Sequence, residues 1–268
     1  MNLSPADIQH FHDEGYLIFP GLIHGEKLAR YKAALDELVE RAESMDESSG
    51  GYTLQPDEDG KLIAGRLFKV QGVCVVEPRI LDLAREPEIT DRVAALIGPQ
   101  VHMFGSKFFP MLPRGGTSTG WHQDNHYFGT NSERVVSCGI YLEDTDRSNA
   151  CLRLLPRSHA SGELVEHAHG TGTFATGNWT EVDESQAIDV VCPGGTVVLF
   201  SANLLHGAST NTSDRSRYST AWHYIPADLD LERFPFGEFE NGIRQLAERF
   251  RAEYAKSTGA SKPGINLL

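Results

Sequence analysis

Residues 199–224 read LFSANLLHGASTNTSDRSRYSTAWHY and carry the pattern that decides the fold. Both ends of this segment are short runs of apolar, β-branched and aromatic residues, and Gly, Ser, Asn and Asp dominate between them. Two such runs separated by turn-forming residues are typical of neighbouring antiparallel strands. The segment therefore predicts a hairpin, in which one strand ends near His206 and the next begins around Arg215.

The same pattern of short apolar runs separated by turn-forming residues extends over most of the chain from about residue 100 to residue 225. Its apolar runs are short and are separated by Gly, Pro, Asn and Asp turns; they are VHMFGSKFFPML (101–112), RVVSCGIYLE (134–143), CLRLLP (151–156), AIDVVC (187–192) and TVVLFSA (196–202). Many short strands at this spacing favour a sandwich or barrel over a parallel βαβ sheet. Residues 160–186 interrupt them as a long insertion.

Helices are expected mainly before this β-rich region. Ser4 is positioned to cap the first helix, and Asp7 completes a capping box. Apolar residues recur at three- and four-residue steps in the longest one. The expected helices span residues 4–14, 25–45, 88–97 and, after the β-rich region, 237–256. The polar, glycine-rich stretch 46–60 predicts a mobile loop or the rim of a site.

Length and composition narrow the classes of protein. The 268 residues fit one domain (1–268), in which a helical part of about 1–100 packs on a β-rich core of about 100–225. The 24 Lys and Arg against 37 Asp and Glu give a net charge of −13, which would repel a nucleic-acid backbone. No apolar run is long enough to cross a membrane, and no secretory signal pattern begins the chain. We therefore expect no nucleic-acid or membrane partner and a cytoplasmic location.

The four cysteines fit the same location. No C-x-x-C spacing occurs among Cys74, Cys138, Cys151 and Cys192, so the sequence offers no cysteine zinc site. Scattered cysteines in a chain without a secretory signal predict reduced, buried thiols.

The stretch WHQDNHYFG (121–129) offers the first chemical signal. His122 and Asp124 are two residues apart, so both side chains would project from the same face of an extended strand. An imidazole and a carboxylate on one face supply two ligands of a 2-His-1-carboxylate iron site. The spacing alone favours the simpler interpretation, a histidine hydrogen-bonded to an aspartate in a polar turn, so a third ligand is needed to support a metal site.

The 199–224 segment supplies that ligand and a cation. His206 would lie on one strand, and Arg217 and Ser219 would share a face of the next. A guanidinium beside a hydroxyl makes a good clamp for a carboxylate. The spacing leaves Arg215 open as a rival to Arg217. A metal triad beside a buried cation predicts a co-substrate that chelates metal at one end and ends in a carboxylate, as 2-oxoglutarate does.

At this point the chain resembles the phytanoyl-CoA dioxygenase family of Fe(II)/2-oxoglutarate oxygenases. The resemblance lies in His122-Gln123-Asp124, in His206-Gly207, and in Arg217 and Ser219 at eleven and thirteen residues after His206. It extends to DIQHFHDEGYLIFPGLI (7–23), ACLRLLPRSHASG (150–162) and PGGTVVLFSANLLHGAS (193–209). Together these motifs cover about residues 5–225.

The resemblance implies the fold, the cofactors and the site. The fold is expected to be mainly β with peripheral helices, around a double-stranded β-helix (jelly-roll, cupin-like) core. The metal ligands and catalytic residues are expected to be His122, Asp124 and His206, which bind Fe(II), and the co-substrates are 2-oxoglutarate and O2. The residues that contact 2-oxoglutarate are expected to be Arg217, Ser219, Lys107 and Gln71. Because Asp124 is present, the resemblance implies oxygen transfer rather than halogenation.

The expected reaction is hydroxylation of a small-molecule metabolite with release of succinate and CO2. Within the same enzyme class, an acyl-CoA hydroxylase stays open, and so does a desaturase, epimerase or cyclase that uses the same iron-based oxidation. From a different class, a non-oxidative metal-binding cupin stays open. Arg217 separates the two classes, because such a cupin has no need of a guanidinium eleven residues after its last ligand.

Overall fold

Two sheets, antiparallel except where β14 pairs with β4, face each other in the computed structural model, which describes residues 3–57, 59–116, 118–169, 177–229 and 265–267. The large sheet has the strand order β1-β11-β6-β13-β4-β3-β2, and β14 pairs with β4. The small sheet has the order β10-β7-β12-β5. This is the double-stranded β-helix that the sequence predicted.

The strands of the large sheet are β1 (Tyr16–Phe19), β2 (Tyr52–Pro56), β3 (Leu62–Gln71), β4 (Val101–Phe109), β6 (Val136–Tyr141), β11 (Thr196–Ser201), β13 (Ser219–Pro226) and β14 (Ile265–Leu267). Those of the small sheet are β5 (Thr119–His122), β7 (Leu152–Leu154), β10 (Ile188–Asp189) and β12 (His206–Ala208). A separate two-stranded ribbon joins β8 (Ala168–His169) to β9 (Asn178–Trp179).

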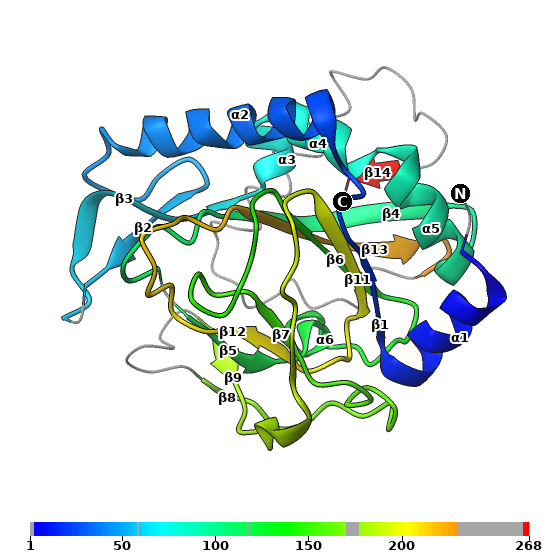
Figure 1. Cartoon of the computed structure of the whole chain (residues 1–268). Coiled ribbons are helices and arrows are strands. Elements are labelled where there is room, and N and C mark those ends of the chain that lie inside the picture. The colour runs from blue at the N-terminus through cyan, green and yellow to red at the C-terminus, as the bar shows by residue number, and fades with distance from the viewer. Residues whose placement is uncertain (1–2, 58, 117, 170–176, 230–264, 268) are drawn as a thin grey trace.

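The helices are α1 (Pro5–Glu14), α2 (Gly25–Ala42), α3 (Val73–Val76), α4 (Pro78–Ala84), α5 (Pro87–Ile97) and α6 (Asp124–Phe128), with a 3₁₀ turn, η2, at Glu184–Gln186. Helices α2 to α5 cover the face of the large sheet that points away from the small sheet, whereas α6 lies on the side of the small sheet (Figure 1). The capping box of α1 forms as expected, since the Ser4 hydroxyl accepts from the Asp7 amide and the Asp7 carboxylate accepts from the Ser4 amide. The main core lies between these helices and the sheet, and a second apolar cluster lies between the two sheets.

Two sequence predictions about the fold were wrong. The expected hairpin around residue 210 does not form, because β12 belongs to the small sheet while β13 lies between β4 and β6 in the large one. The stretch 46–60 is not wholly loop, since it contains β2, which pairs with β3. The part expected to be mainly helical, about 1–100, also contributes β1, β2 and β3 to the large sheet. The helix expected at 237–256 lies outside the described residues.

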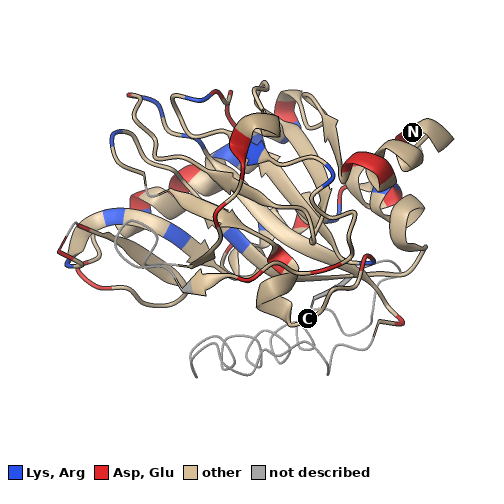
Figure 2. Ribbon diagram, turned by 90° about the horizontal axis from the view of Figure 1, so that it is seen from below, with Lys and Arg blue, Asp and Glu red and all other residues tan. Residues whose placement is uncertain are grey.

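None of the helices in the described residues is both long and apolar enough to span a bilayer. Figure 2 shows acidic and basic residues interspersed over the described elements.

All four cysteines are buried and unpaired, as predicted.

Candidate metal centre and co-substrate pocket

His122 and His206 lie side by side between the two sheets. They are directly opposite each other in the pairing of β5 with β12, and their ring centroids are 4.2 Å apart. Each Nδ1 donates to a main-chain carbonyl oxygen, that of Gly120 at 2.8 Å for His122 and that of Leu204 at 2.9 Å for His206. Because a carbonyl oxygen only accepts, these bonds place the proton on Nδ1 and leave both Nε2 atoms free to bind a metal.

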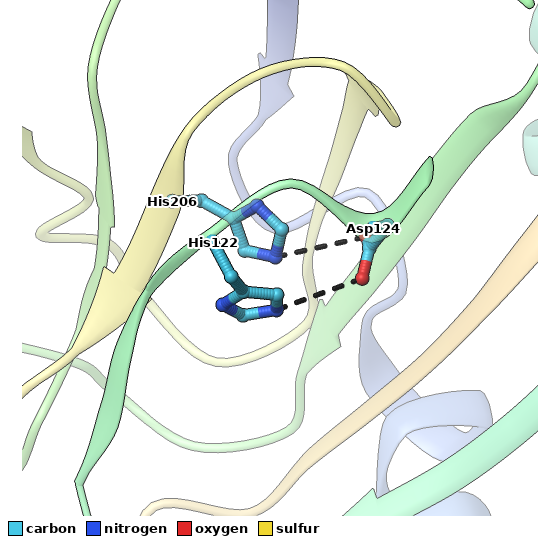
Figure 3. Close-up of side chains that lie close together, drawn as sticks. All are labelled: His122, Asp124 and His206. Carbon is cyan, nitrogen blue, oxygen red and sulfur yellow. Dashed lines mark ion pairs between the residues drawn. The ribbon is translucent and has the colours of Figure 1, made fainter. Parts of the chain in front are cut away.

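Asp124 completes a group of three possible ligands, although not from a strand as predicted. β5 ends at His122, and the chain turns so that Asp124 is the first residue of α6. Its Oδ1 lies 3.7 Å from His122 Nε2 and its Oδ2 lies 3.6 Å from His206 Nε2 (Figure 3). The three donor atoms all lie within 4.8 Å of one another. Two imidazoles and one carboxylate in this arrangement match the facial triad of non-haem iron sites.

Electrostatics favour the protonation states that metal binding requires. Burial, assisted by the neighbouring His122, lowers the pKa of His206 to about 4, so its imidazole is neutral at pH 7. Burial alone would raise the pKa of Asp124, but the surrounding imidazoles, His206 foremost, hold it well below its usual range. A neutral imidazole and an ionised carboxylate are the metal-binding forms of these groups.

A buried hydroxyl and a third histidine support Asp124 from behind. The Ser137 hydroxyl donates to Asp124 Oδ2 at 2.6 Å, and it lies 3.0 Å from His223 Nδ1. Since the hydroxyl proton goes to the carboxylate, His223 donates its Nδ1 proton to Ser137. Sequence reasoning missed both residues. Only the period-two spacing from Ser219 to His223 hinted that His223 faces the site.

A cavity of about 110 Å³ runs from the three possible ligands to Arg217. Arg217 is 5% exposed, and its Nη1 donates to Ser219 Oγ at 2.8 Å. Its Nε is buried with no hydrogen-bond partner, and no carboxylate of the described residues forms an ion pair with it. An unpaired buried cation is unfavourable, so this guanidinium is suited to an anion that enters the cavity.

The two arginines that the sequence left open lie in different environments. Arg215 is exposed and forms an ion pair with Asp146 on the surface. Arg217 lines the cavity and Arg215 does not.

The large sheet brings the remaining sequence candidates together. Lys107 lines the cavity from β4, opposite Ala221 of β13. Burial lowers the pKa of Lys107, and the nearby Asp124 opposes this effect. Gln71 pairs with Lys107 across β3 and β4, but it is not among the residues that line the cavity.

Lys69 is a cation on this side of the sheet that sequence reasoning missed. It lies two residues before Gln71 on β3 and therefore faces the same way. Burial, together with the neighbouring Lys107, lowers its pKa to about 8. The large sheet thus presents Lys69 and Lys107 on the side that bears the cavity, and Arg217 lines the same cavity from the loop before β13.

A model of the phytanoyl-CoA dioxygenase (PhyH) family matches residues 11–219. The chain belongs to this family. It is a 2-oxoglutarate-dependent dioxygenase, with iron and 2-oxoglutarate as its cofactor and co-substrate.

Two curated relatives illustrate the range of this family. A probable alpha-ketoglutarate-dependent hypophosphite dioxygenase of Stutzerimonas stutzeri is 26% identical over 222 residues, which cover 81% of this chain and 76% of that protein. The peroxisomal phytanoyl-CoA dioxygenase of Rattus norvegicus is 23% identical, over 94% of this chain and 77% of that protein.

Solved structures support the fold. The carbocyclase SnoK from nogalamycin biosynthesis superposes with a TM-score of 0.71 at 20% identity, covering 99% of this chain and 94% of its own. EctD from S. alaskensis, solved with 2-oxoglutarate and 5-hydroxyectoine, gives 0.65 at 20% identity, covering 84% and 76%.

Proposed function

We propose that this member of the PhyH family hydroxylates a small-molecule metabolite, and that one O2 and one 2-oxoglutarate are consumed for each product. One oxygen atom would enter the substrate and the other would enter succinate, with CO2 released. The observation that carries the proposal is Arg217, which is buried without a carboxylate partner at the end of a cavity that begins at three possible metal ligands.

The metal-binding residues in this proposal are His122, Asp124 and His206. The residues fit iron because both imidazoles have a free Nε2 and the carboxylate is ionised. Three protein ligands leave three positions of an octahedral ion open. When bound, iron and O2 supply the oxidising power. The protein holds the ligands in place, and Ser137 restrains the carboxylate.

The proposed residues for 2-oxoglutarate are Arg217, Ser219, Lys107 and Gln71. Arg217 and Ser219 would hold the distal carboxylate, since they lie at the end of the cavity away from the possible ligands and are bonded to each other. Lys107 would contact the co-substrate from the side, and its charge supports a dianion in the cavity. Gln71 would reach the co-substrate only by a change of side-chain conformation, because it pairs with Lys107 without lining the cavity.

A small molecule is favoured over an acyl-CoA because of charge. The chain has a net charge of −13, and its sequence has no cluster of Lys and Arg to hold a polyphosphate. The hypophosphite relative is named for a small substrate as well.

The presence of Asp124 as a third possible ligand favours oxygen transfer over halogenation, and hydroxylation is the outcome that we propose. Cyclisation and epimerisation remain outcomes for the test, since SnoK is a carbocyclase and the structurally similar SnoN, at 20% identity and a TM-score of 0.62, is an epimerase.

Anaerobic addition of Fe(II) and 2-oxoglutarate to the purified protein tests the centre. We expect a weak visible charge-transfer band, and then substrate-dependent succinate release in air while candidate metabolites are screened. Asp124→Ala should abolish this coupled turnover, and His206→Ala should abolish the band. Asp214→Ala, which removes an exposed carboxylate paired with Arg114, is the matched control and should retain both. Undiminished turnover in Asp124→Ala would refute the ligand assignment, and mass spectrometry of the product separates hydroxylation from cyclisation or epimerisation.

A further inference from the structure

Tyr141 is a residue of the cavity to which neither the family resemblance nor the sequence motifs give a role. It is the last residue of β6, is 4% exposed, and lies directly opposite Ser219 of β13. The guanidinium of Arg217 lies over its ring, 5.4 Å from the centroid. Its phenol therefore belongs to the group of side chains at the distal end of the cavity.

The ring of Tyr141 leans back along its own strand, over Gly139. A Cβ built on Gly139 would lie 3.3 Å from the Tyr141 hydroxyl oxygen and 3.4 Å from Cε2. Gly139 pairs with Ala221 across β6 and β13, so two small residues form this part of the wall. Gly139 does not have the positive φ that explains many glycines. Since glycine weakens a strand, its presence in β6 is best explained by the space that the phenol occupies.

This placement puts the phenolic hydroxyl between Arg217 and the possible metal ligands. The next pair on the same face of β6 and β13 is Ser137 with His223, which supports Asp124. Tyr141 and Ser219 lie on the other side of the Gly139–Ala221 pair. Both pairs line the cavity that contains Asp124 and Arg217, so a molecule that connects the metal site to Arg217 would lie beside this part of the wall.

The hydroxyl is available as a donor. No hydrogen bond to it occurs within the described part of the chain, although buried tyrosine hydroxyls usually have a partner. Burial raises the pKa of Tyr141, so the phenol keeps its proton at physiological pH. The neutral Tyr141 hydroxyl lies beside the Arg217 guanidinium, which has no anionic partner, so the two groups together are suited to bind a carboxylate.

We propose that Tyr141 is a co-substrate-binding residue, whose hydroxyl donates a hydrogen bond to a carboxylate of 2-oxoglutarate while Gly139 leaves the space that this position of the ring needs. The inference rests on the proposed path of 2-oxoglutarate from the metal to Arg217. It adds a donor to the clamp formed by Arg217 and Ser219.

The test compares Tyr141→Phe with Tyr218→Phe. Tyr218 follows Arg217 in the sequence, as Tyr141 neighbours it in space. Its ring packs on Phe108 in the main core and does not line the cavity, so Tyr218→Phe is a matched control. The dissociation constant of 2-oxoglutarate is measured by anaerobic titration of the charge-transfer band, and independently by the thermal shift that 2-oxoglutarate produces. Tyr141→Phe should weaken binding about 10- to 100-fold, as expected for loss of a hydrogen bond to a charged acceptor, while Tyr218→Phe should stay within about threefold of the wild type.

Unchanged 2-oxoglutarate binding in Tyr141→Phe would overturn the proposal, and so would an effect confined to the KM of the primary substrate. If the wild-type protein binds Fe(II) and 2-oxoglutarate and Tyr141→Phe binds equally well, only the role of Tyr141 fails. If the wild-type protein itself does not bind them, the proposed function fails.

Gly139→Ala gives a second, independent test. The added methyl group would displace the hydroxyl by a few tenths of an ångström and should weaken 2-oxoglutarate binding in the wild-type background. In the Tyr141→Phe background the same change should have a smaller effect, because the displaced oxygen is absent. An equal loss in both backgrounds would show that the methyl group acts on the co-substrate without the hydroxyl, which contradicts the proposal.

Discussion

Replacing Arg217 by methionine should have opposite effects on the free protein and on its complex with 2-oxoglutarate. Methionine keeps much of the aliphatic length of arginine and removes the charge. In the free protein the guanidinium is 5% exposed, has an unpartnered Nε and forms no ion pair with the described carboxylates. Substitution of an uncompensated buried charge by an apolar side chain is often stabilising, so the melting temperature of the free variant should rise or stay equal.

The loss of co-substrate affinity follows from the same geometry. One terminal nitrogen of Arg217 donates to Ser219, which leaves Nε and the other terminal nitrogen for a carboxylate. Each charge-assisted hydrogen bond contributes ~1.5–3 kcal/mol, so loss of two bonds costs at least about 3 kcal/mol. At ~1.4 kcal/mol for each factor of ten, the dissociation constant of 2-oxoglutarate should rise ~100-fold or more.

Thermal unfolding with and without 2-oxoglutarate measures both effects in one experiment. Bound ligand should raise the melting temperature of the wild-type protein, because it binds only the folded state, and the same concentration should raise that of Arg217→Met much less. Arg215→Met is the control, since its partner Asp146 is on the surface. The reasoning fails if Arg217→Met keeps the wild-type ligand shift, or if Arg215→Met is the variant that loses it.

Three further predictions concern the metal, the backbone and pH. Ser137→Ala should lower Fe(II) affinity ~10-fold or more by releasing Asp124, as titration with Fe(II) would measure; unchanged affinity would contradict the supporting role. Gly195→Ala should lower the free energy of unfolding in urea by several kcal/mol, because its Cβ would lie 1.7 Å from a main-chain oxygen. Gly60 has nearly the same φ and meets no atom within 4 Å, so Gly60→Ala should lower it by only ~1–2 kcal/mol. Similar losses in the two variants would be inconsistent with the steric argument. The affinity for 2-oxoglutarate should fall several-fold as the pH rises through about 8, since Lys69 is charged below its pKa and neutral above it. Lys69→Met should make the affinity independent of pH in this range. A wild-type affinity that does not change through pH 8 would exclude a contribution of the Lys69 charge to 2-oxoglutarate binding.

Much of the local structure could be predicted because its causes are local. The capping box at Ser4 and the apolar periodicity after residue 25 specify α1 and α2 through neighbours three or four residues away. The predicted end of α2, at residue 45, was three residues too late. The series of short apolar runs after residue 100 predicted a sandwich or barrel, and the structure has two sheets that face each other.

The sequence by itself determined the chemistry of this protein: the ligand types His122, Asp124 and His206, and a cation eleven residues after the last of them. The tertiary structure decided which residues meet. It placed Asp124 on a helix, put His206 in the small sheet and Arg217 in the loop before β13, exposed Arg215, and brought Ser137, His223 and Tyr141 to the cavity. The physical reason is that the type of a side chain is encoded at its own position. Its neighbours across a sheet are set by the register of strands that are distant in sequence, and that register follows from the packing of the whole core.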